Sequence, residues 1–127
     1  NVREKVTISA TAATGTVNFD AITQSVLYYT TNASGNWTLN VRGDGSTTLN
    51  SIMATGDSLT IAFLVTQGSS AYYQATFKVD GSAVTPKYAG GSAPSAGNAS
   101  GIDGYAMTII KTGDAAFTAL GALTEFG

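Results

Sequence analysis

Apolar and polar residues alternate through the middle of the chain, from Asp57 to Gly81. Apolar side chains occupy every second position of Leu59–Val65, and they do so again in Tyr73–Val79, after a turn at Gln67–Ser70. Successive side chains of a pleated strand point to opposite faces, so each alternating set forms one apolar face. The pattern predicts two neighbouring strands, against which the rest of the chain packs.

The same period of two recurs before and after this pair. Further strands are predicted at Val6–Ala10, Thr16–Phe19, Ser25–Thr30, Trp37–Arg42, Val84–Tyr88, Tyr105–Lys111 and Ala116–Phe126. Pro86 lacks an amide donor, so its strand should lie at a sheet edge or a bulge. Asp80-Gly81 predicts a tight hairpin turn, because both positions tolerate a positive φ.

The alternation stops between Gly43 and Gly56. Ser46-Thr47-Thr48 offers hydroxyl groups that can cap a helix, and Leu49–Met53 then carries apolar residues at helical spacing. We expect one or two turns of helix across the end of a sheet, ended by Gly56.

About nine short strands with frequent turns are typical of an all-β, antiparallel β-sandwich of the jelly-roll kind. Residues 1–127 are expected to form one domain, with a core centred on Trp37, Phe63 and Phe77. Because the chain begins with Asn1 rather than Met, we also expect it to be processed or to be a module of a longer polypeptide. Ala89–Gly104 is the longest irregular stretch, and loops of that length tend to be functional or disordered.

Charged residues are scarce, at 11% against about 25% in an average protein. The six basic residues are scattered, which disfavours nucleic acid and anionic membrane surfaces as partners. The longest apolar run, Ile61–Val65, is far shorter than the roughly 20 residues that cross a bilayer. A surface so poor in charge suits a protein that is covered by its own copies or by neighbours.

Residues suited to catalysis are few. Histidine and cysteine are absent, which removes the commonest metal ligands and the nucleophile systems that depend on them. A glycosidase would need two carboxylates facing each other across a cleft, whereas several of the eight here lie in glycine-rich turns. We therefore predict no enzyme activity, no catalytic residues and no cofactor; a calcium ion held by Asp44 or Asp103 with loop carbonyls stays open.

Three tyrosines are the candidate binding or interface residues. Tyr28, Tyr72 and Tyr88 lie beside loops or on the side of a strand opposite to the predicted core. Tyrosine is common at interfaces because it is large and rigid and carries a polar tip. Each of the three could equally be a partly buried core residue.

Nearly the whole chain, from about Val6 onward, resembles a module of virion structural proteins of marine tailed phages, cyanophages especially. The matching segments are Val17–Asp20, Ser25–Ser34, Asn36–Arg42, Ala62–Gly68, Val84–Tyr88, Gly97–Asp103, Thr108–Gly113 and Phe117. Many of these modules have Trp where this chain has Tyr88, a difference that leaves the implied fold unchanged.

The resemblance implies a non-enzymatic component of a tail fibre, a collar fibre or the capsid surface, located in the virion. Its partners would be other virion proteins and copies of itself, as a trimer if it belongs to a fibre. No catalytic residue is carried over from such modules. The alternative is a carbohydrate- or receptor-binding tip that recognises a host surface glycan through Ala89–Gly104 and the nearby tyrosines.

Overall fold

The protein is nearly all β in a computed structural model that describes residues 4–127. Arg3, one of the six basic residues, lies outside the described residues. The strands are β1 (Val6–Ala12), β2 (Gly15–Asp20), β3 (Val26–Thr31), β4 (Trp37–Arg42), β5 (Ser58–Thr66), β6 (Gln74–Val79), β7 (Ser82–Ala83), β8 (Lys87–Tyr88), β9 (Ile102–Gly113) and β10 (Ala116–Phe126). The helix found among these residues is α1 (Leu49–Ile52), and no helix there is long and apolar enough to cross a membrane.

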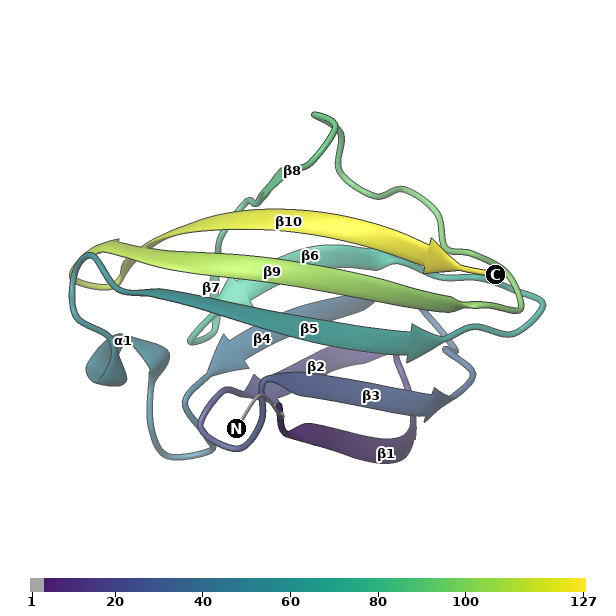
Figure 1. Cartoon of the computed structure of the whole chain (residues 1–127), viewed down its shortest axis with the longest axis horizontal. Coiled ribbons are helices and arrows are strands. Elements are labelled where there is room, and N and C mark those ends of the chain that lie inside the picture. Colours follow the sequence, from purple (N-terminus) through teal and green to yellow (C-terminus); the bar gives the residue numbers. More distant parts are fainter. Residues whose placement is uncertain (1–3) are drawn as a thin grey trace.

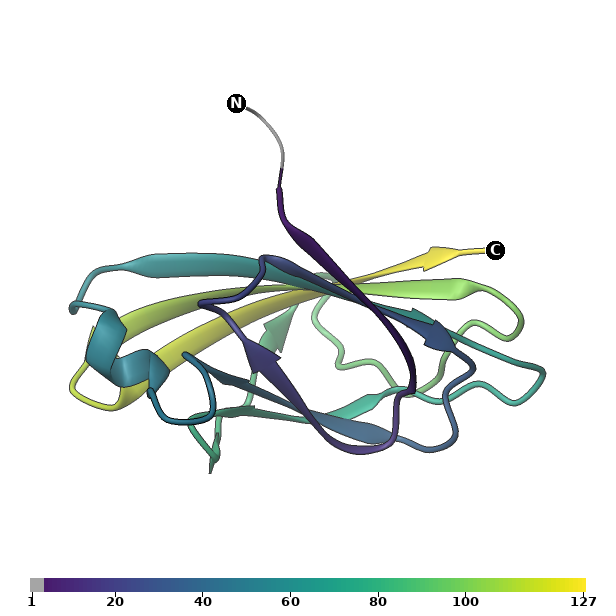
Figure 2. The same cartoon turned by 90° about the horizontal axis from the view of Figure 1, so that it is seen from below.

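The first six strands alternate between two sheets (Figure 1). Sheet A has the order β1-β3-β5-β9-β10-β8, and sheet B has the order β2-β4-β6-β7. Strands β1, β3 and β5 run parallel to one another in sheet A, as do β2, β4 and β6 in sheet B. The chain therefore winds through three successive coils, each with one strand in either sheet. Figure 2 shows the two sheets as two layers.

The remaining strands make both sheets mixed. Strands β9 and β10 form a long antiparallel hairpin that extends sheet A beside β5. Strand β7 pairs antiparallel with β6 through the Asp80-Gly81 turn, where both residues have positive φ, so the predicted hairpin is confirmed. Five of the eight strand pairings are parallel, so antiparallel sheets and a jelly-roll topology are not confirmed.

Two predictions about the strands are wrong: one concerns which strands are neighbours, and the other the extent of a strand. Strands β5 and β6 are not neighbours, because the chain crosses from sheet A to sheet B between them. Val84–Tyr88 is not one strand: β7 and β8 have two residues each and lie in different sheets, with Pro86 in the link between them. Alternation identifies the buried face of a strand, but it does not identify the strand beside it.

The predicted helix forms and has about one turn, within the expected one or two. Thr48 caps it by accepting a hydrogen bond from the Ser51 amide, and the helix ends at Met53 rather than at Gly56. Leu49 and Met53 are buried as predicted, whereas Ile52 is exposed.

Both sheets contribute to one hydrophobic core, and the three predicted central rings are at most 2% exposed. Trp37 of sheet B meets Phe63 and Tyr105 of sheet A edge to face, with ring centroids 5.8 and 5.5 Å apart. Edge-to-face packing of this kind is favourable beyond the buried area. Trp37 therefore joins the two layers at their centre.

A bulge in β6 changes which of its residues face inward. The pairing of β4 with β6 shifts after Trp37, so that Gln74 is buried while Ala75 is exposed, contrary to the predicted alternation. Trp37 Nε1 donates to the side-chain oxygen Oε1 of Gln74 at 3.3 Å. The backbone N–H of Gln74 donates to the Tyr105 hydroxyl at 3.2 Å. These bonds satisfy the polar groups that the bulge brings into the core. Burial raises the pKa of Tyr105.

Replacing Phe63 by Ala should lower the free energy of unfolding by about 3–5 kcal/mol, because it removes a fully buried ring between the sheets. The matched control is Phe126→Ala, whose ring is 56% exposed and whose loss should cost less than about 1 kcal/mol. Urea denaturation followed by tryptophan fluorescence measures both. Equal losses would contradict the assigned core.

Alkaline pH should destabilise the protein through Tyr105. Because its pKa is higher in the folded state than in the unfolded state, the unfolded tyrosine loses its proton first, and stability falls as the pH rises above about 10. Tyr105→Phe should reduce this fall, although Tyr29 and Tyr88 also have raised pKa values and preserve part of it. Thermal unfolding of both proteins across the alkaline range tests this; parallel curves would argue against it.

Candidate functional site

The first strand directs its apolar residues away from the core. Val6 is 44% and Ile8 is 69% exposed, whereas Thr7 and Ser9 lie on the core side and are half-buried. Thr7 Oγ1 donates to Gln24 Oε1 at 2.7 Å, which closes this end of the core with polar groups. The register of a strand is normally set by burying its apolar side. The apolar side of β1 is therefore not covered by any of residues 4–127.

Neighbouring strands continue this apolar surface, which we call the outer face of sheet A. Pairing aligns Val6 with Val26 of β3, and Ile8 with Tyr28. The same rows continue across β5, β9 and β10. The apolar members of the outer face of sheet A include Val6, Ile8, Val26, Tyr28, Ala62, Leu64, Ile102, Ala106, Ile110, Leu120, Ala122 and Phe126.

The outer face of sheet A has almost no charge. Its rows across β1, β3, β5, β9 and β10 contain threonine, serine and apolar residues, and the nearest charged partner is Lys87 in the edge strand β8. Thr60 and Thr108 share a hydrogen bond between their hydroxyl groups at 2.9 Å, so each has its partner within the face. A large uncharged apolar surface of this kind marks an interaction site.

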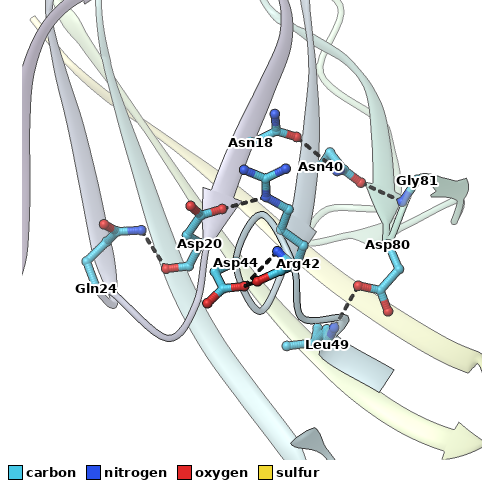
Figure 3. A network of polar contacts seen from close by, with 10 residues as sticks. Asn18, Asp20, Gln24, Asn40, Arg42, Asp44, Leu49, Asp80 and Gly81 are labelled. Carbon is cyan, nitrogen blue, oxygen red and sulfur yellow. Dashed lines mark hydrogen bonds and ion pairs between the residues drawn. The ribbon is translucent and has the colours of Figure 1, made fainter. Parts of the chain in front are cut away.

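Sheet B has the opposite character on its outer side (Figure 3). Asn40 Nδ2 donates to Asn18 Oδ1 at 3.0 Å, and Arg42 Nε donates to Asp20 Oδ1 at 2.7 Å. The hydrogen bond that Arg42 donates to Asp20 raises the pKa of Arg42. Both members of the ion pair are about 30% exposed, so the pair is worth at most about 1 kcal/mol. This side is suited to water, in contrast to the outer face of sheet A.

A polar hollow of about 400 Å³ lies where β4 ends, beside α1 and the β6–β7 turn. Its carboxylates already serve the local fold. Asp80 accepts hydrogen bonds from the Leu49 and Asn50 amides at 2.6 and 2.9 Å, holding the start of the helix. Asp44 accepts a hydrogen bond from the Ser46 amide at 2.9 Å, which lowers the pKa of Asp44. Both side chains thus act as caps for backbone amides.

The three candidate tyrosines do not form one surface. Tyr28 is half-buried on the outer face of sheet A, in its second strand, whereas β8 with Tyr88 lies four strand spacings away, about 19 Å. Tyr88 pairs with Gly121, where a Cβ would lie 2.6 Å from Tyr88 Cε1, so its ring covers Gly121 and packs against the core. Tyr72 also packs against the core, and both of its backbone polar groups are bonded to the Gln67 side chain.

Val6 and Ile8 are the surface residues that the sequence-based candidates omit. The alternation of Val6–Ala10 correctly predicts a strand, but an alternating segment does not show which of its faces meets the core. One feature of the sequence does bear on this choice: the residues that alternate with Val6 and Ile8 are Thr7 and Ser9, which are small and polar and would add little to a hydrophobic core.

A buried carboxylate, that of Asp103, lies at the other end of the molecule from Asp44. Asp103 is fully buried, and its Oδ2 accepts hydrogen bonds from Gln67 Nε2 at 3.1 Å and the Asn98 amide at 3.0 Å. Asp103 Oδ1 and Asn98 Nδ2 have no hydrogen-bond partner within residues 4–127. In the same range, no three acidic residues form a group that could hold a metal ion.

Comparison of the chain with protein-family models, with curated proteins and with solved structures finds no match.

Replacing Asp103 by Ala should lower the free energy of unfolding by about 2–4 kcal/mol, because it leaves the Asn98 amide buried without an acceptor and removes a bond to Gln67. Asp114→Ala is the control: this exposed carboxylate accepts one hydrogen bond from Asn50, and its loss should cost less than about 1 kcal/mol. Urea denaturation compares the two. A smaller loss for Asp103→Ala than for the control would refute a structural role for Asp103.

Proposed function

We propose that this protein is a non-enzymatic structural component of a phage virion: a β-sandwich of two mixed sheets that belongs to a tail fibre, a collar fibre or the capsid surface. It acts through self-assembly and docking on other virion proteins, and the outer face of sheet A is the surface that a copy or another virion protein covers. The observation that carries the proposal is the polarity of β1, which exposes Val6 and Ile8 while it turns Thr7 and Ser9 toward the core.

Covering this face with another protein would be favourable, because it would remove exposed apolar side chains from water. Full burial of an isoleucine or valine side chain is worth about 1.5–3 kcal/mol. Ile8 retains more than half of its surface in solvent, so most of that gain is available only on contact with another molecule. The same holds in smaller measure for Val6 and Leu120.

Two further features support a structural role over an enzymatic one. The polar hollow beside α1 has its carboxylates bound to backbone amides, where they hold a helix and a turn. Charged residues make up 11% of the chain, a composition that suits a surface covered by neighbours. The assignment to a virion rests on the resemblance of the chain to modules of marine tailed-phage proteins.

The location of the protein tests this proposal. Antibodies raised against the purified chain should label particles of the phage that encodes it, in immunogold electron microscopy, at regular positions on the tail, collar or capsid. Particles without label, from lysates that contain the protein, would refute the virion assignment. Label confined to distal fibre tips, together with binding of the chain to a glycan array, would instead support the carbohydrate- or receptor-binding alternative.

A further inference from the structure

We infer that the outer face of sheet A binds a second copy of this chain, face to face and about a two-fold axis. The inference rests on the proposed function in one respect, that this face is covered by protein, and it goes further by naming the occupant and its orientation. Three properties of the face favour a second copy: its size, its lack of charge and the match between its two sides.

The face is large enough for a stable dimer. Strands β9 and β10 have 12 and 11 residues, so at about 3.3 Å per residue each is more than 30 Å long. Five strands, from β1 to β10, at about 4.8 Å spacing make the face more than 20 Å wide. The resulting area is roughly 700 Å², close to the 800 Å² that each partner contributes to a standard interface.

The lack of charge suits contact between identical faces. In a two-fold interface the same surface supplies both sides, so a charge on the face would be brought close to its own copy. Strands β1, β3, β5, β9 and β10 direct no charged side chain outward. Lys87 lies beyond β10 in the edge strand, where it lines one side of the hollow next to β10.

The two sides of the face match each other in shape. The side formed by β1 carries the exposed side chains of Val6 and Ile8. The side formed by β9, β10 and β8 is hollowed by about 400 Å³ over small residues, among them Ala106 and Ala122. A two-fold axis along the strands at β5 would place β1 of each copy over β10 of the other. Val6 shares its row with Ala122, and Ile8 shares its row with Thr124. Each copy would thus place its Val6 in the hollow of its partner and its Ile8 next to that hollow, over Thr124.

Sedimentation velocity at tens of micromolar tests the inference on the whole chain. The unaltered protein should have the mass of two chains. Ile8→Lys should raise the dissociation constant by about 100-fold or more, because it buries an unpaired charge. Thr16→Lys adds the same charge on the outer side of sheet B, where Thr16 is exposed, and should leave the dimer intact. Circular dichroism should show that both variants unfold at the same temperature as the unaltered protein.

A charge pair tests the orientation. Ala122→Glu alone should also give single chains, since it places a charge in the hollow. An equimolar mixture of Val6→Lys and Ala122→Glu should recover dimers, because Val6 and Ala122 share a row: the heterodimer sets the lysine of one chain beside the glutamate of the other and keeps the second contact unaltered. Failure of the mixture to recover dimers overturns the orientation.

A single-chain mass for the unaltered protein overturns the second copy as the occupant. This outcome is distinct from failure of the proposed function: a monomer that still labels virions would keep the docking role with another virion protein. A dimer that labels no particle would keep the inference and lose the virion assignment.

Discussion

The edge-to-face contact of Trp37 with Phe63 and Tyr105 connects the two sheets, and the rest of the structure depends on it. Each coil of the chain leaves sheet A, contributes a strand to sheet B and returns, so the layers stay together only if their inner faces adhere. The three rings supply that adhesion at the centre, where the indole also finds an acceptor in Gln74. The bulge in β6 is what brings Gln74 to this position.

This arrangement places the apolar residues of the two sheets unequally. Sheet B buries its apolar side and presents asparagine, threonine and an ion pair to solvent, as expected of a surface that faces water. Sheet A is apolar on both sides, because Leu27 and Phe63 face the core while Val26 and Leu64 face outward. A sheet with two apolar faces is suited to a partner on each side, and we propose that the second partner is another protein. That asymmetry is the structural basis of the proposed assembly role.

Part of the candidate surface could be read from the sequence. Tyr28 was identified because it falls on the parity opposite to Leu27, and it does lie on the outer face of sheet A. Tyr72 and Tyr88 pack against the core, which is the alternative that the sequence leaves open for each of them; loops and short edge strands have no alternation that would orient their side chains. The alternation of Val6–Ala10 does not show that Val6 and Ile8 belong to this surface, because the same pattern fits a strand with either side toward the core.

The sequence by itself determined the all-β character of the chain, the bounds of most strands, the burial of Trp37, Phe63 and Phe77, and the turn at Asp80-Gly81. These properties are local: they follow from side chains that alternate with a period of two and from residues that tolerate positive φ. Only the tertiary structure decided the parallel coils, the separation of β5 from β6 and the outward side of β1. Strand pairing and the choice of face depend on contacts between residues far apart in the chain, and a local pattern is compatible with several such arrangements.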